Sequence, residues 1–157
     1  MPITAGGIHY VIDDLRPPWR ELSLPVVFSH GIGTNLHLWS EWGPVIAAHY
    51  PTIRFDMRGF GRSIVPPEGH IWSMVELVED LWEVVDAAGA NRVHLVGESF
   101  GGTVALAAAV AHSDRVVSVS LYNSPFRVQE ISQIQYWQDD FAQGGPDGWS
   151  NRMLQHR

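Results

Sequence analysis

Hydrophobic positions along the chain follow two alternating patterns. Short apolar runs typical of buried strands recur between breaks, at positions 8–12, 25–29, 52–55, 93–97 and 116–121. Longer stretches with helical spacing lie among them, at positions 38–49, 74–88 and 100–111, the first interrupted near Gly43-Pro44. Strands that alternate with helices indicate βαβ units. The sequence therefore predicts an α/β fold with a mostly parallel sheet flanked by helices.

The segment 74–88 gives the strongest helix signal. Its apolar face carries Ile71, Met74, Val75, Val78, Leu81, Trp82 and Val85. Its other face carries Glu76, Glu79, Asp80, Glu83 and Asp86, which we expect to be solvated. Ser73 and Glu76 have capping-box spacing at the start, and Gly89 suits the C-terminal cap.

The pattern changes after Leu121. Apolar residues at helical spacing predict one amphipathic helix, and they are Val128, Ile131, Ile134 and Phe141. The run Gly-Gly-Pro-Asp-Gly at 144–148 predicts a turn. A domain boundary is therefore expected near residue 125, with segments 1–125 and 126–157.

Composition excludes several classes of protein. The net charge is −7, and the ten cationic residues, all Arg, are scattered, which argues against nucleic-acid binding. There is no Cys, so a disulfide scaffold and a Cys nucleophile are excluded, and the histidines lack metal-ligand spacing. No apolar run approaches the roughly 18 residues of a membrane span, and no signal peptide is visible at the N-terminus. We expect a cytoplasmic protein that binds no membrane and no metal.

A first chemical motif lies between a predicted strand and a predicted helix. Gly97-Glu98-Ser99-Phe100-Gly101 matches G-x-S-x-G. The glycines are needed because the turn is too sharp for larger side chains. The turn would raise the Ser99 hydroxyl to the carboxyl end of the sheet, where open α/β folds place their sites. The positive end of the following helix would favour a developing anion there.

Two further motifs follow the preceding strands. His30-Gly31-Ile32-Gly33 comes after the run at 25–29, where small residues let backbone amides face a bound carbonyl. The amides of Ile32 and Phe100 would then form an oxyanion hole. The third motif, 56–63, reads Asp-Met-Arg-Gly-Phe-Gly-Arg-Ser after the run at 52–55.

These three motifs, in this order and spacing, resemble the α/β-hydrolase family over roughly residues 8–125. The resemblance implies that Ser99 is the nucleophile, that Ile32 and Phe100 supply the oxyanion-hole amides, and that no cofactor is needed. It also implies substrate contacts, which we assign to His30, Gly31, Gly33 and Glu98. The 56–63 motif would be a structural loop beside the site, so Asp56 is not catalytic. Segment 1–125 would be the N-terminal part of the hydrolase core, and 126–157 the beginning of a cap or lid.

The family also requires an acid and a histidine later in the chain, in the order Ser, Asp or Glu, His. The chain ends at residue 157, 36 residues after Leu121, which is too short for a cap, two further strands and both partners. His112 and Asp114 lie at the far end of the helix after Ser99, and we expect structural roles for them. His30 is a candidate base close to the site, although we expect it mainly to order its loop. The other candidates lie near the C-terminus: His156 as a base, and Asp139, Asp140 and Asp147 as acids. We expect Trp137 and Trp149 to pack within the cap.

Three hypotheses remain open from the sequence. The first is a serine hydrolase of carboxylic esters or lactones, as part of a longer enzyme, with C–C bond hydrolysis and cofactor-free haloperoxidase chemistry as variants. The second is a non-catalytic chain that binds a small apolar ligand or a partner chain, since the strand at 116–121 would leave an exposed sheet edge. The third is a half-enzyme completed by a second chain. Ser at position 99 argues against related dehalogenases and epoxide hydrolases, which carry Asp there. The sequence does not define the substrate or the oligomeric state.

Overall fold

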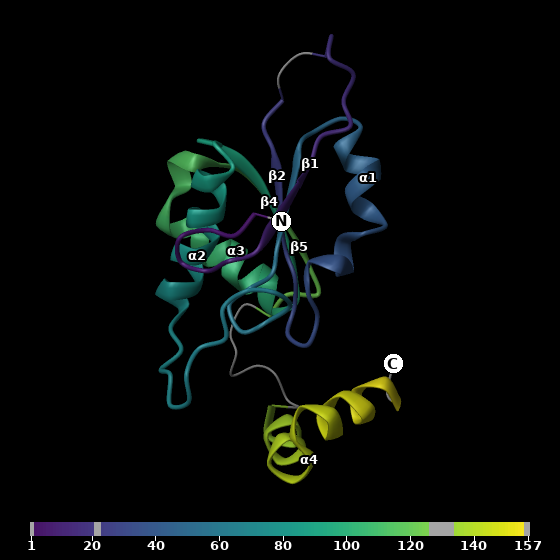
Figure 1. Cartoon of the computed structure of the whole chain (residues 1–157), viewed down its shortest axis with the longest axis vertical. Helices are drawn as coiled ribbons and strands as arrows, with labels where there is room; N and C mark the ends of the chain where they lie inside the picture. Colours follow the sequence, from purple (N-terminus) through teal and green to yellow (C-terminus); the bar gives the residue numbers. More distant parts are fainter. Residues whose placement is uncertain (1, 21–22, 126–133, 156–157) are drawn as a thin grey trace. The chain divides into compact units, whose positions relative to one another are not determined.

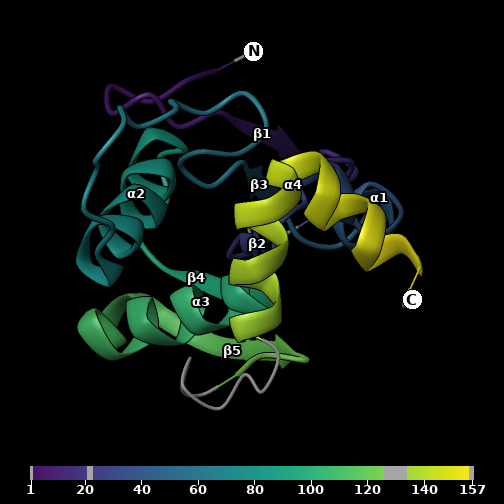
Figure 2. The same cartoon turned by 90° about the horizontal axis from the view of Figure 1, so that it is seen from below.

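The computed structural model describes residues 2–20, 23–125 and 134–155, and they form two compact units, Met1–Ser124 and Pro125–Arg157. The first unit holds a five-stranded sheet of order β1-β3-β2-β4-β5 (Figure 2). The strands are β1 (Tyr10–Asp13), β2 (Val26–Ser29), β3 (Thr52–Phe55), β4 (Val93–Glu98) and β5 (Val116–Tyr122). All neighbouring pairs are parallel except β1 with β3, which is antiparallel. This confirms the predicted α/β fold with a mostly parallel sheet.

Helices cover the two faces of the sheet unequally. Helices α2 (Met74–Ala87) and α3 (Phe100–Ala111) lie on one face, and α1 (Trp42–Ala47) lies on the other (Figure 1). The larger hydrophobic core forms on the α2 and α3 side, where Leu81, Val85, Leu95 and Val104 are fully or almost fully buried. A smaller cluster of Val26, Phe28 and Trp39 forms on the α1 side.

The predicted helix at 38–49 is two shorter elements. A 3₁₀ turn, η1 (Leu36–Trp39), precedes α1, so the break lies at Ser40 and Glu41 rather than near Gly43-Pro44. Pro44 is tolerated because it lies in the first turn of α1, where a missing backbone N–H breaks no helical hydrogen bond.

The acidic face of α2 is less solvated than predicted. Asp80 is only 4 % exposed and pairs with Arg58, while Glu83 accepts hydrogen bonds from the Thr4 hydroxyl and the Gly6 N–H. Ser73 caps the helix as predicted, since its Oγ accepts the Glu76 N–H at 3.1 Å. Helical periodicity distinguishes the two faces of α2 but cannot show which acids meet distant partners.

Strand β5 forms one edge of the sheet in the described residues, in agreement with the predicted exposed edge (Figure 2). Three of its apolar side chains are exposed, those of Val117, Leu121 and Tyr122. A second 3₁₀ turn, η2 (Ser113–Arg115), leads into the strand. Parallel sheets are usually covered on both faces, and natural proteins usually protect the edge strands of their sheets.

The second unit contains α4 (Ile134–Gln155), which is kinked at Gly145, where φ is 61°. The kink lies within the predicted turn at 144–148. Trp149 stacks on Phe141 with ring centroids 5.3 Å apart and meets the edge of Trp137 at 6.3 Å, so both tryptophans pack within this unit as expected. Buried Asp140 pairs with Arg152 at 2.9 Å, which gives this acid a structural role. Part of the predicted amphipathic helix, at Val128 and Ile131, lies outside the described residues.

Candidate active site

Ser99 lies at the sharp turn between β4 and α3. Its backbone has φ 53° and ψ −126°, a conformation that non-glycine residues seldom adopt and that costs roughly 1–3 kcal/mol. Hydrogen bonds hold the turn on both sides: the Ser99 N–H donates to the Tyr122 carbonyl at 3.0 Å, and the Ser99 carbonyl accepts the Gly102 N–H at 3.0 Å. The surrounding structure therefore fixes a strained residue at the carboxyl end of the sheet.

Glycines make this turn possible because backbone atoms surround it. A Cβ at Gly97 would overlap the backbone of Gly102, and a Cβ at Gly101 would overlap the carbonyl oxygens of Ser29 and His30. The G-x-S-x-G spacing thus has a steric cause in the packing of β4, α3 and the end of β2.

The loop after β2 lies directly against Ser99. Ser29 pairs with Gly97 in the register of β2 and β4, so the two strands end side by side. A Cβ at Gly31 would lie 3.0 Å from the Ser99 Cβ. Ile32, 40 % exposed, follows Gly31 in this loop, and half-buried Phe100 begins α3. The residues predicted to supply the oxyanion-hole amides therefore flank the predicted nucleophile; their role stays a prediction.

His30 supports the loop that follows β2, and its predicted substrate contact stays a prediction. The ring is fully buried; its Nδ1–H donates to the Gly31 carbonyl at 2.8 Å, and its Nε2 accepts the Met57 N–H at 2.9 Å. This bonding fixes a neutral tautomer. Burial lowers the pKa of the His30 imidazole, and the Gly31 carbonyl and the Asp56 charge oppose that shift only partly. His30 thus links the candidate oxyanion loop to the loop after β3.

Asp56 joins three segments around the site, which the sequence did not indicate. Its Oδ1 accepts the Leu36 N–H at 2.8 Å, and its Oδ2 accepts the Arg62 N–H at 3.0 Å and bonds His9 Nδ1 at 2.8 Å. Burial raises the pKa of this carboxyl, but these hydrogen bonds outweigh burial and the pKa lies below its ordinary value. A carboxylate that accepts bonds from three segments is a structural hub.

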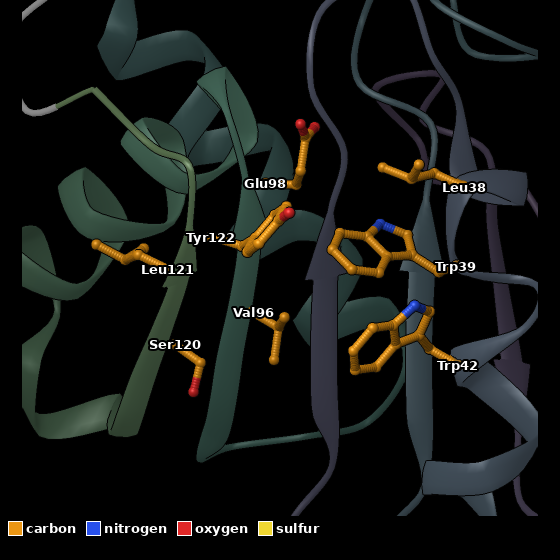
Figure 3. Close-up of a pocket in the computed structure, with 8 residues that line it drawn as sticks. All are labelled: Leu38, Trp39, Trp42, Val96, Glu98, Ser120, Leu121 and Tyr122. Carbon is orange, nitrogen blue, oxygen red and sulfur yellow. The ribbon is translucent and has the colours of Figure 1, made fainter. Parts of the chain in front are cut away.

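The other predicted substrate contacts differ in their surroundings. Gly31 is buried against Ser99 and Glu98, whereas Gly33 is exposed with φ 75°. Glu98 lines a cavity of about 500 Å³ on the α1 face of the sheet. Figure 3 shows Trp39 and Trp42 on one side of this cavity, Val96 and Tyr122 on the other, and the Glu98 carboxylate at one end.

No histidine ring hydrogen-bonds the Ser99 hydroxyl within the described part of the chain. His112 instead meets the edge of Trp82, with ring centroids 5.2 Å apart, which agrees with its expected structural role. His156, the candidate base, lies outside the described residues. Among residues 2–20, 23–125 and 134–155 there is no group of three or more His, Asp or Glu placed to hold a metal, and no helix long and apolar enough to cross a membrane.

Comparisons with known proteins identify the fold family. Residues 25–154 match the family model for the alpha/beta hydrolase fold. The chain is 31 % identical over 122 residues to the putative carbamate hydrolase RutD of Caulobacter segnis, covering 76 % of this chain and 44 % of that protein. It is 33 % identical over 118 residues to epoxide hydrolase 3 of Xenopus tropicalis, covering 74 % of this chain and 30 % of that protein.

A solved structure gives the same result for the fold. The enol-lactonase from Burkholderia xenovorans superposes with a TM-score of 0.81 at 25 % identity, covering 96 % of this chain and 56 % of that one. The chain thus spans less than half the length of the two curated relatives. With the family model matched over most of its length, the chain belongs to the alpha/beta hydrolase fold family.

Proposed function

We propose that this chain carries the nucleophile and oxyanion hole of a serine hydrolase that acts on carboxylic esters or lactones. The observation that carries the proposal is the strained backbone of Ser99, held at the junction of β4 and α3 with Gly31 against its Cβ. Strain of this kind persists only where the surrounding structure over-determines it, and it clusters at active sites.

The proposed reaction has two steps. The Ser99 hydroxyl attacks the substrate carbonyl carbon, its proton passes to a base and then to the departing alkoxide, and an acyl-serine forms as the C–O bond breaks. Water then hydrolyses the acyl-serine and releases the acid. The N–H groups of Ile32 and Phe100 would stabilise the oxyanion in both steps, each typically contributing about 3–4 kcal/mol.

The proton acceptor would come from outside the described residues. This fits a chain that spans 44 % of the carbamate hydrolase relative. Relatives include an epoxide hydrolase; serine at position 99, where the epoxide hydrolases of this family carry Asp, supports the acyl-transfer route over epoxide opening.

The test uses the native protein product that carries this sequence, after its intact mass has been measured. A fluorophosphonate should modify Ser99, located by peptide mass mapping, and hydrolysis of short p-nitrophenyl esters should disappear in Ser99→Ala. Ser113→Ala, in an exposed 3₁₀ turn, is the matched control and should keep both signals. Undiminished ester hydrolysis in Ser99→Ala would overturn the proposal.

A second candidate function is non-catalytic binding of a small apolar ligand or a partner chain. It is supported by the cavity of about 500 Å³ beside Trp39 and Trp42, and by the exposed Leu121 and Tyr122 on the edge strand β5. Sedimentation velocity would test binding of a partner copy, and thermal unfolding with added apolar ligands would test ligand binding. A monomer at all concentrations together with an unchanged melting temperature would argue against this function.

A further inference from the structure

A second cavity lies beside the candidate oxyanion hole, on the α2 side. It measures about 250 Å³, and Ile32 and Phe100 both line it. Its other walls come from the loop after β3, the loop before α2, and α2 itself: Met57, Arg58, Phe60, Trp72 and Leu77. The residues predicted to hold a substrate carbonyl through their N–H groups therefore line one and the same cavity.

The position of Ile32 and Phe100 indicates which part of a substrate would face the cavity. A carbonyl oxygen bound by the N–H groups of Ile32 and Phe100 would lie between them, next to Ser99. The carbon substituent of that carbonyl would then have the cavity lined by these two residues beside it.

The cavity presents almost no net charge to a ligand. Its one ionic residue, Arg58, bonds both oxygens of Asp80, through Nε at 2.9 Å and Nη2 at 2.6 Å. Its Nη1 also lies 3.5 Å from Glu76 Oε1. Burial raises the pKa of the Asp80 carboxyl, and the bonds from Arg58 oppose that shift. Because the guanidinium is engaged by two acids, it offers little attraction to a substrate carboxylate.

We propose that this cavity is the acyl pocket of the site, that it takes a short, neutral, apolar acyl group, and that Trp72 limits the chain length it accepts. The inference rests on the proposed function, because it takes Ile32 and Phe100 as the carbonyl-binding residues. The remaining walls are apolar: Met57 and Leu77 are 2 % and 7 % exposed, with Phe60 beside them.

The volume supports a small acyl group. Pockets for drug-sized ligands usually measure about 300–1,000 Å³, so a cavity of about 250 Å³ lies below this range. A short alkyl or small ring substituent fits this space, whereas a long fatty acyl chain would have to pass Trp72.

Trp72 is the wall that substitution can remove at least cost to the fold. Its side chain is 52 % exposed, whereas Leu77 belongs to the main core. The ring packs over Gly59 and against the edge of His70, with centroids 5.0 Å apart. His70 in turn bonds Glu76 at 2.8 Å, so the loop that carries Trp72 is tied to the start of α2.

The experiment measures binding of unreactive carbonyl compounds by methyl NMR of the methionines and leucines. Methyl n-alkyl ketones of increasing length serve as probes, because they carry the carbonyl and alkyl parts of a substrate but cannot be hydrolysed. We expect shifts at the methyl groups of Met57 and Leu77. Kd should fall about fourfold per added methylene, equivalent to about 0.8 kcal/mol, until the pocket is full. In Trp72→Ala this limit should move to longer chains, whereas Trp72→Phe should stay near the parent protein.

Trp42→Ala is the matched control, because Trp42 is similarly exposed at 63 % but lines the larger cavity on the other face. It should leave the ketone series unchanged. Ketone-induced shifts at Leu38 and Leu121, abolished by Trp42→Ala, would overturn the inference, as would an unchanged length limit in folded Trp72→Ala. The two proposals fail separately: ketone binding without fluorophosphonate labelling refutes the nucleophile, and labelling without shifts at Met57 and Leu77 refutes the pocket.

Discussion

Replacing Asp56 should show how much of the stability depends on one buried carboxylate. Asp56→Ala removes the acceptor for three buried or half-buried donors, the N–H groups of Leu36 and Arg62 and the ring of His9. A buried donor left without a partner costs about 1–3 kcal/mol. Because neighbouring losses do not add fully, we expect Asp56→Ala to lower the free energy of unfolding by about 3–6 kcal/mol.

Asp56→Asn removes the charge at this position but keeps part of its hydrogen bonding, so it distinguishes the two contributions to stability. The amide oxygen can still accept the Leu36 N–H, and the amide NH₂ faces His9 Nδ1, to which it can donate when that nitrogen carries no proton. The Arg62 N–H then faces a donor. We expect a loss of about 1–2 kcal/mol, clearly smaller than for Ala.

Urea unfolding at pH 7, followed by tryptophan fluorescence and by far-UV circular dichroism, gives the free energy of unfolding of each variant. The comparison holds if the dependence of that free energy on urea concentration is the same for parent and variants. Asp14→Asn is the control, since Asp14 pairs with Arg16 at the surface and is 42 % exposed; its change should stay within about 0.5 kcal/mol. A loss below about 1 kcal/mol for Asp56→Ala, or equal losses for Asn and Ala, would refute the hub role.

The lowered pKa of Asp56 adds a pH test with a defined sign. Its stabilising contribution is present above the ordinary carboxyl pKa of 3.8 and is lost as pH falls through the lowered folded-state pKa. The parent protein should therefore lose stability relative to Asp56→Asn on acidification below about pH 4, and parallel curves would contradict the assignment.

Two other substitutions test the sharp turn at Ser99 and the loop after β2 that lies against it. Gly101→Ala should lower stability by about 3 kcal/mol or more, because its Cβ meets backbone carbonyls that cannot move aside; Gly144→Ala, whose Cβ meets nothing within 4 Å, should be near neutral in the same urea assay. His30 has a pKa lowered by burial, so the unfolded chain binds a proton more readily, and stability should fall as pH drops below about 6.5, by up to about 1.4 kcal/mol per pH unit. His30→Gln should be less stable than the parent protein at pH 7.5, but its stability should not show this dependence on pH. If the parent protein and His30→Gln lost stability equally between pH 7.5 and 5.5, burial of His30 would be excluded as the cause of the pH dependence.

The sequence alone determined the order of elements in the first unit. Segments 52–55 and 100–111 match β3 and α3 residue for residue, and 74–88 ends one residue beyond α2. These elements have strong local signals: a β-branched run between breaks, a regular apolar face, or a motif that forces a turn. The position of Ser99 at the end of β4 follows from the G-x-S-x-G motif between a predicted strand and a predicted helix. The carbonyl oxygens of Ser29 and His30 that crowd Gly101 are contributed by the tertiary structure.

The tertiary structure decided which residues meet. His30 follows a strand beside the site, and only the fold shows that its ring is buried between two loops. Asp80 is one of five acids on a helix face, and only the approach of Arg58 buries it. The hydrogen bonds of Asp56 and the cavity lined by Ile32 and Phe100 both bring together segments that are far apart in the sequence. Local sequence patterns determine strands, helices and turns because these elements depend on residues that are close together in the chain. Contacts between distant segments depend on the order and register of the strands, and no local pattern in this sequence specifies either.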